Sequence, residues 1–325
     1  MKDADDGYIP LKIRFLGWWE GMDPAFLMRQ QQQAQDGGGT PLPSAGDDEA
    51  ETEIVRSGEA VDDELPDLDS ALAIREAVWG KGYVKPGGKD AILSLAGPAE
   101  LGEDSPVLVL GAGLGEGAMA VAGEWLANVE GLVDAGPTAE KATARIAARG
   151  MSDTVSVTSY MPQNARLKVN QYRCVLARES FFDLMAKQTL LEKIWNALKE
   201  DSHFLFSDLV YATEAAAQDP VIEEWCDKEL RMPDCWTMEQ YDETLTGFGF
   251  VIKSTEDESD WYYGLVKAKW LEFMDTLGGK NIERKYIDLV MDEAQLWQSR
   301  MKAIKSGHLR YVRVHAYRRL DKDIK

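Results

Sequence analysis

The segment that most constrains the fold begins at Pro106 and reads PVLVLGAGLGEGAMAVAGEW. A short run of valine and leucine is typical of a parallel strand that is covered on both faces. Glycines follow at alternating positions, Gly111, Gly113 and Gly115, and lead directly into a helical pattern. Glycine permits left-handed dihedrals and close approach of the backbone to a ligand, and the N–H groups of a helix N-terminus are free to bind one. The segment therefore predicts a strand, a loop that cradles a ligand, and a helix.

From Ser70 onward the chain alternates between helical and strand patterns. Strands are predicted at 107–110, 129–135, 155–161, 171–179, 202–210, 249–257 and 306–320. Two helices, at 261–275 and 283–305, are predicted to precede the last strand. Strands that alternate with helices form parallel sheets with helices on both faces. We therefore predict an α/β fold with a doubly wound, seven-stranded, mostly parallel, Rossmann-like sheet and a helical insertion before its last strand.

The N-terminal part has a different composition. Residues 1–29 contain a mixed aromatic and aliphatic stretch, with Trp18 and Trp19, that predicts a docking segment or lid. Residues 30–66 combine glutamines, glycines, prolines and acids, which cannot bury enough apolar surface to offset the entropy of ordering. We predict a disordered acidic linker there, and a single folded domain over 67–325.

Charge and composition exclude several classes of function. The net charge is −20, and eleven acids against one base between Asp47 and Asp69 account for half of it. Such a surface repels nucleic acids and anionic membranes. No apolar run approaches the ~18 residues of a membrane span. Three cysteines without a CxxC pair favour free thiols in the cytoplasm, and three scattered histidines argue against a metal site. We expect a small-molecule partner and a monomer or homodimer.

Asp134, an acid at the end of the second predicted strand, limits the kinds of ligand that the glycine loop could bind. A carboxylate at this place can accept hydrogen bonds from both hydroxyls of a ribose, although it could also cap a turn. A dinucleotide loop needs glycine where this chain has Glu116, whose charge would repel a pyrophosphate. S-adenosylmethionine has a positive sulfur and no phosphate, so the sequence favours it over NAD.

With these features the chain resembles the class I S-adenosylmethionine-dependent methyltransferases, and among them the phosphoethanolamine and sarcosine N-methyltransferase group. Arg178-Glu179 stands where these enzymes have R-D, and Ser207-Asp208 matches their S-D. KGYVKPGG, at Lys81–Gly88, resembles the aromatic and glycine loop that they place over the cofactor. Asp183 stands where the phosphoethanolamine enzymes have a histidine, and the acid that they carry after the third strand is absent.

The resemblance implies S-adenosylmethionine as cofactor, methyl transfer to a small molecule, and an amine as the acceptor. The residues that it assigns to the cofactor are Gly111, Ala112, Gly113, Gly115, Asp134, Ala135, Tyr160, Met161 and Arg178. An amine must lose its proton before it attacks the methyl group, so a carboxylate or phenol should lie near it. The candidates for this catalytic role are Glu179, Asp183 and Tyr83, with Asp208 as a further acid.

Other interpretations are compatible with the same residues. The glycine loop could belong to an NAD(P)-dependent oxidoreductase, or to a non-catalytic module that binds the cofactor. Glu179, Asp183 and Asp208 could hold backbone or neighbouring loops, and Tyr83 could cover the cofactor. A protein or a lipid could also be the methyl acceptor.

Overall fold

The computed structural model describes residues 9–35, 68, 70–134, 136–278, 280 and 282–319. The chain divides into two compact units. One contains the residues up to Val78 together with Val266–Ala294, and the other contains Trp79–Leu265 and Gln295–Lys325. The domain bounds predicted from the sequence, with one folded domain over 67–325, stay a prediction.

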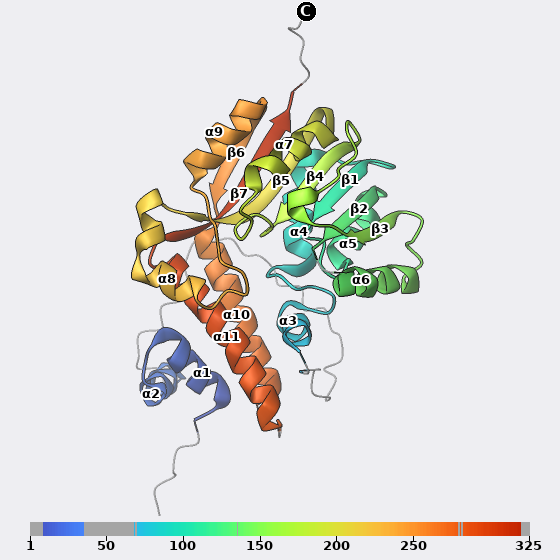
Figure 1. The fold of residues 1–325 in the computed structure, drawn as a ribbon. Coiled ribbons are helices and arrows are strands. Elements are labelled where there is room, and N and C mark those ends of the chain that lie inside the picture. Colours follow the sequence, from blue (N-terminus) through green and yellow to red (C-terminus); the bar gives the residue numbers. More distant parts are fainter. Residues whose placement is uncertain are drawn as a thin grey trace, which may run out of the picture. The chain divides into compact units, whose positions relative to one another are not determined.

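The larger unit contains a seven-stranded sheet with the strand order β3-β2-β1-β4-β5-β7-β6 (Figure 1). Its strands are β1 Pro106–Leu110, β2 Asn128–Val133, β3 Val155–Ser159, β4 Tyr172–Arg178, β5 Leu198–Tyr211, β6 Phe250–Asp257 and β7 Leu309–Arg318. The first five strands pair in parallel, and β7 runs antiparallel to both β5 and β6. The predicted fold class is confirmed. Because the chain leaves β1 toward β2 and β3 and returns to β4, the order reverses between β1 and β4, where ligands bind in such sheets.

The two faces of the sheet carry separate apolar cores. Val107 and Val109 of β1 pack in one core, whereas Leu108 and Leu110 pack in the other. Successive side chains of a strand point to opposite faces, so a strand covered on both sides needs apolar residues at every position. The helices of the larger unit include α4 Gly88–Ala96, α5 Glu116–Trp125, α6 Gly136–Ala148, α7 Lys187–Ala197, α8 Pro220–Cys226 and α9 Met238–Phe248. Helix α3, Ala71–Trp79, belongs to the smaller unit up to Val78. The insertion before β7 consists of α10 Ser259–Leu277 and α11 Arg284–Lys305.

The smaller unit begins with α1 Leu11–Glu20 and α2 Pro24–Gln35. Phe15 of α1 stacks on Trp270 with ring centroids 6.0 Å apart, and Trp270 is fully buried. Lys267 and Glu20 form an ion pair at 2.6 Å. Helix α2 continues through 30–35, which the sequence assigns to the linker, while residues 36–66 of that linker lie outside the described residues.

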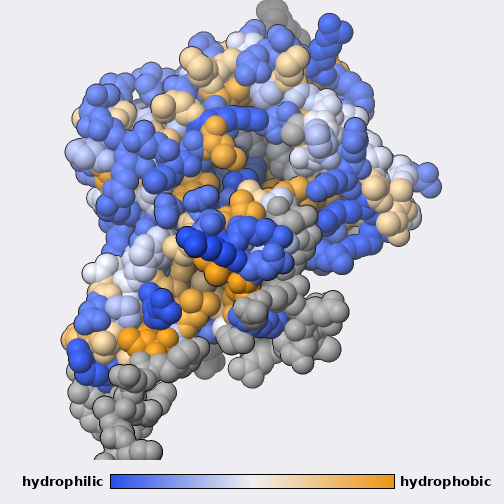
Figure 2. Space-filling view, turned by 60° about the horizontal axis from the view of Figure 1, so that its bottom comes forward, coloured by the Kyte–Doolittle hydropathy of each residue, from blue (hydrophilic) through white to orange (hydrophobic). Residues whose placement is uncertain are grey.

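Polar residues dominate the face that Figure 2 shows, with apolar patches between them. Among the described residues, we find no helix whose length and apolar character would suit a membrane span.

The N-terminus of α9 provides a test of local stability. The hydroxyl of Thr237 accepts a hydrogen bond from the N–H of Gln240, and the Gln240 side chain accepts one from the N–H of Thr237. We expect Thr237→Ala to lower the free energy of unfolding by about 1 kcal/mol, because the helix loses its cap. Urea denaturation measures this change. Thr237→Ser keeps the hydroxyl and should remain within a few tenths of the wild-type value, and equal losses in both variants would contradict the explanation.

Candidate active site

The glycine loop follows β1 and adopts the backbone that only glycine takes easily. The φ angles of Gly111, Gly113 and Gly115 are 65°, 55° and 90°. A Cβ on Gly111 would lie 2.5 Å from Oγ of Ser180 and 2.9 Å from Nζ of Lys85. Both the dihedral angles and the lack of space therefore require glycine at Gly111.

A second glycine-rich segment, Gly80–Gly88, lies against this loop. Tyr83, Val84 and Lys85 line the same small cavity as the first residues of the glycine loop and Arg178. The cavity has a volume of about 50 Å³. Pockets for small molecules measure ~300–1,000 Å³, so the cavity as it stands is smaller than a nucleoside needs.

Lys85 places a buried ammonium group at the end of β4. Its Nζ donates to the backbone oxygens of Arg178 and Glu179, the latter at 3.2 Å. Burial lowers the pKa of the Lys85 ammonium, and the negative charge of Glu179 opposes that shift. Arg178 in turn donates to the backbone oxygen of Pro86. The backbone oxygens of Arg178 and Glu179 thus accept hydrogen bonds from the amine of Lys85. S-adenosylmethionine also carries an amine, so this part of the site fits the cofactor.

Arg231, in the segment between α8 and α9, joins three of the predicted site residues. Its guanidinium pairs with Asp134 at the end of β2 and lies 3.7 Å from Oδ2 of Asp183. Burial raises the pKa of the nearby Tyr160 phenol, and the charges of Asp134 and Asp183 raise it further. Asp134 is 40% exposed, so a ligand can reach its carboxylate from solvent.

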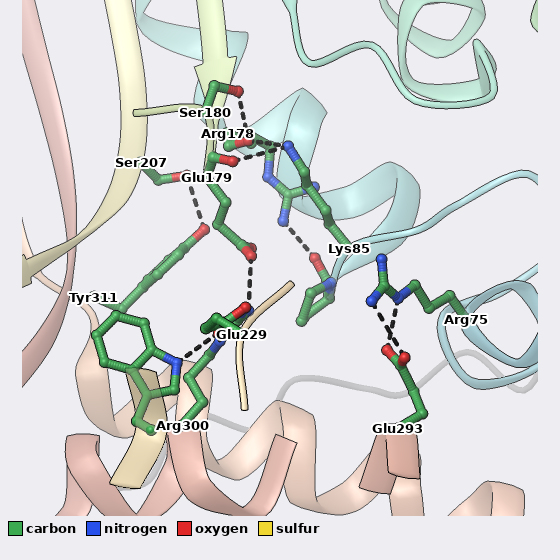
Figure 3. A network of polar contacts seen from close by, with 12 residues as sticks. Arg75, Lys85, Arg178, Glu179, Ser180, Ser207, Glu229, Glu293, Arg300 and Tyr311 are labelled. Atoms are coloured by element: carbon green, nitrogen blue, oxygen red, sulfur yellow. Dashed lines mark hydrogen bonds and ion pairs between the residues drawn. The ribbon is translucent and has the colours of Figure 1, made fainter. Parts of the chain in front are cut away.

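Glu179, directly after β4, and Asp208, within β5, are buried acids. Glu179 pairs with Arg300 of α11 at 3.4 Å (Figure 3). Asp208 accepts a hydrogen bond from the hydroxyl of Tyr241 at 3.2 Å, and burial raises its pKa to about 7. Burial, together with Glu116 and Asp90, raises the pKa of Tyr83 to about 12. Tyr83 is therefore protonated near neutral pH and can donate a hydrogen bond, but it is a poor base.

The predicted site residues fall into groups. Gly111, Ala112, Gly113, Arg178 and Tyr83 line the cavity. Asp134, Asp183 and Tyr160 surround Arg231, and Glu179 contacts Arg300.

Three of the predicted residues lie apart from these groups. Gly115 caps α5, and a Cβ there would lie 3.4 Å from Ala142 and Ile146. Met161 is 66% exposed, and Ala135 lies outside the described residues. In the part of the chain that the structure describes, no group of three or more His, Cys, Asp or Glu side chains could hold a metal ion.

Three cations in these contacts were not among the predicted site residues. Lys85 lies inside the KGYVKPGG motif, so its position could have been inferred from the resemblance. Arg231 and Arg300 carry no local signal, because the acids they contact are distant in the sequence.

No family model matches the chain. The chain is 26% identical, over 233 residues, to the phosphoethanolamine N-methyltransferase of Plasmodium falciparum (isolate 3D7). The match covers 68% of this chain and 83% of that protein.

Solved structures give the same picture of the fold. The phosphoethanolamine N-methyltransferase 2 of Haemonchus contortus, in complex with S-adenosyl-L-methionine, matches 77% of this chain with a TM-score of 0.68 at 16% identity. A proposed sarcosine dimethylglycine methyltransferase from Galdieria sulphuraria matches 77% with a TM-score of 0.64 at 14% identity, over 98% of its own length. The chain spans only 57% of the Haemonchus protein. The predicted resemblance is confirmed: this chain has the fold of the class I S-adenosylmethionine-dependent methyltransferases and is similar to the phosphoethanolamine and sarcosine N-methyltransferase group.

Proposed function

We propose that this chain binds S-adenosylmethionine and transfers its methyl group to the nitrogen of a small-molecule amine. The observation that carries the proposal is the arrangement at the switch point of the sheet. There the glycine loop follows β1, Asp134 follows β2, and carbonyl groups at the end of β4 hold an amine, that of Lys85. This arrangement offers a ribose acceptor and an amine acceptor beside a loop that admits close contact.

On the cofactor side, each residue has a stated task. When bound, the cofactor supplies a methyl group made electrophilic by the positive sulfur. The backbone of Gly111, Ala112 and Gly113 accommodates it without side-chain interference, and the carboxylate of Asp134 accepts the ribose hydroxyls. Tyr160 and Met161, after β3, border the base, with Gly115, Ala135 and Arg178 completing the set.

On the acceptor side, the protein orients the amine and takes its proton. Glu179 offers a buried carboxylate, Asp183 offers a second one beside Arg231, and Tyr83 donates a hydrogen bond from its neutral phenol. One of the similar Haemonchus structures contains phosphomonomethylethanolamine. The acceptor screen therefore starts with phosphoethanolamine and its monomethyl form, with ethanolamine and sarcosine beside them. A cytoplasmic monomer or homodimer is the setting that we propose.

Calorimetric titration of the full chain with S-adenosylmethionine, S-adenosylhomocysteine and NAD tests the cofactor. We expect the first two to bind, and Asp134→Ala to weaken them about 10- to 100-fold, because hydrogen bonds to a charged group contribute ~1.5–3 kcal/mol. Arg231→Ala is the matched control. It removes the competing cation from Asp134 and should leave the affinity unchanged or higher.

Binding of NAD without either adenosyl compound would favour the oxidoreductase and contradict our proposal. Binding of the adenosyl compounds without release of S-adenosylhomocysteine in the presence of any amine would favour a non-catalytic module.

A further inference from the structure

Arg300 of α11 forms the centre of a buried ion network. Its side chain is only 6% exposed, and its Nε donates to Oε1 of Glu229 at 2.9 Å. Its Nη1 donates to Oε2 of Glu179 at 3.4 Å. The guanidinium also lies over the ring of Trp297, 4.5 Å from its centroid. These contacts hold the guanidinium on several sides, so its orientation toward Glu179 is fixed (Figure 3).

The carboxylate of Glu179 is bound on one side only. Oε2 faces Arg300, whereas Oε1 is buried and has no hydrogen-bond partner among the described residues. Beside the effect of burial, the charge of Glu179 raises the pKa of three nearby donors, Lys85, Tyr311 and Tyr262. The hydroxyl of Tyr262 is itself buried without a partner among the described residues, whereas the other two donors are used elsewhere. Lys85 donates to backbone oxygens, and the hydroxyl of Tyr311 donates to Ser207 at 2.8 Å. Buried polar atoms nearly always have a partner, and a buried carboxylate oxygen without one is costly. The missing partner is therefore a hydrogen-bond donor.

The backbone of Glu179 also points to function. Its φ is 44°, in the left-handed region that a glutamate rarely adopts, and its N–H donates to the backbone oxygen of Ser207 at 2.7 Å. Strain of this kind persists where surrounding contacts enforce it, and it concentrates at active sites and ligand clamps. Here the hydrogen bond to β5 holds the backbone of Glu179, and the ion pair with Arg300 holds its side chain.

The two acids of the network share one guanidinium. Glu179 and Glu229 both pair with Arg300, and the ammonium of Lys85 lies at the backbone oxygen of Glu179 rather than at its carboxylate. Glu229 accepts the indole N–H of Trp225 and the N–H groups of Arg300 on the same oxygen, Oε1. Oε1 of Glu179 is the carboxylate oxygen of this triad that is buried without a partner among the described residues. A protonated amine that donates to Oε1 of Glu179 would supply the hydrogen bond that this oxygen lacks.

We propose that Arg300 is a positioning residue for the methyl acceptor. It holds one oxygen of Glu179 so that the other is presented to the N–H group of the amine. This rests on the proposed function, in which Glu179 contacts the acceptor. It adds that the helical insertion before β7 contributes to acceptor binding through a residue that does not touch the acceptor.

The test uses calorimetric binding of phosphoethanolamine and of sarcosine to the full chain saturated with S-adenosylhomocysteine. Arg300→Met alone would leave two buried carboxylates without a cation and could unfold the protein. It is therefore combined with Glu229→Gln, which keeps an acceptor for Trp225. We expect the double variant to weaken amine binding at least tenfold and to change the affinity for S-adenosylhomocysteine less than twofold. Arg300→Lys should recover part of the loss.

Two comparisons separate positioning from general damage. In a Glu179→Gln background, the double variant should weaken amine binding less than twofold further, because Arg300 acts through Glu179. Lys302→Met with Glu224→Gln removes an exposed pair that also connects α11 to α8, and it should leave amine binding unchanged.

Two results would overturn the inference without affecting the proposed methyl transfer. One is unchanged amine binding in the Arg300 variant. The other is that the Arg300 and Glu179→Gln changes weaken amine binding independently, so that their fold-losses multiply. If the wild-type chain binds S-adenosylhomocysteine but neither amine, the inference fails with the proposed acceptor class. If it binds no adenosyl compound, the proposed function itself fails.

Discussion

Replacing Glu179 by glutamine is expected to lower the turnover of the amine acceptor by about 10²–10⁴-fold, the usual contribution of a positioned proton acceptor. Glutamine keeps the size and most hydrogen-bonding capacity of glutamate but cannot take up a proton. Among the described residues, the Glu179 carboxylate contacts Arg300, and arginine cannot accept a proton. Turnover at saturating amine and cofactor measures the effect.

Binding of S-adenosylmethionine provides the internal control for this variant. The cofactor contacts that we propose come from the glycine loop and Asp134, so the dissociation constant should change less than threefold. Turnover within tenfold of wild type would remove Glu179 from the catalytic role and leave it as a structural acid. Asp183→Asn, made in parallel, would then show whether the second carboxylate carries the proton.

Asp208 is expected to make stability depend on pH. Burial raises its pKa from 3.8 to about 7, with Asp183 and Glu179 adding to the rise, while the N–H of Leu209 and the charge of Lys187 oppose it. The folded state therefore holds this proton more tightly than the unfolded state does. The resulting stabilisation is fully present below pH ~4 and is lost as pH rises through about 7.

The measurement is the difference in unfolding free energy between the wild type and Asp208→Asn across this range. Since one pKa unit corresponds to 1.36 kcal/mol, we expect the wild type to lose on the order of 4 kcal/mol relative to the variant between pH 4 and pH 8. Asp153→Asn, on the exposed turn before β3, should run parallel to the wild type. A difference that is flat in pH would show that Asp208 is charged in the folded state at all these values.

The sequence predicted those features that depend on local pattern. Valine and leucine in consecutive positions predicted β1, and alternating glycines predicted the loop that precedes α5, because backbone conformation at these places follows from the residue types themselves. Asp134 was placed correctly at the end of β2 because the apolar strand pattern before it is also local. The helix α2 extends beyond the predicted boundary since its glutamines are good helix formers, although they cannot drive folding alone.

The contacts of the site could not be predicted in this way. Arg231 pairs with Asp134 across about a hundred residues, and Arg300 pairs with Glu179 across 121. The pattern of α11 indicates a helix, but which of its arginines turns toward β4 depends on how α11 is packed. Charged residues that meet through tertiary structure leave no periodic signal in a single sequence.

The amine of Lys85 has a consequence for how affinity should be understood. While it occupies the carbonyls at the end of β4, the chain is its own competitor for that position. The measured affinity for any ligand is the intrinsic affinity reduced by the fraction of molecules in which this side chain has withdrawn. If the cofactor binds as we propose, a ligand that brings its own cation would exchange one ammonium for another, whereas a neutral analogue would leave those carbonyls unsatisfied. We therefore expect Lys85 to make the site favour positively charged ligands.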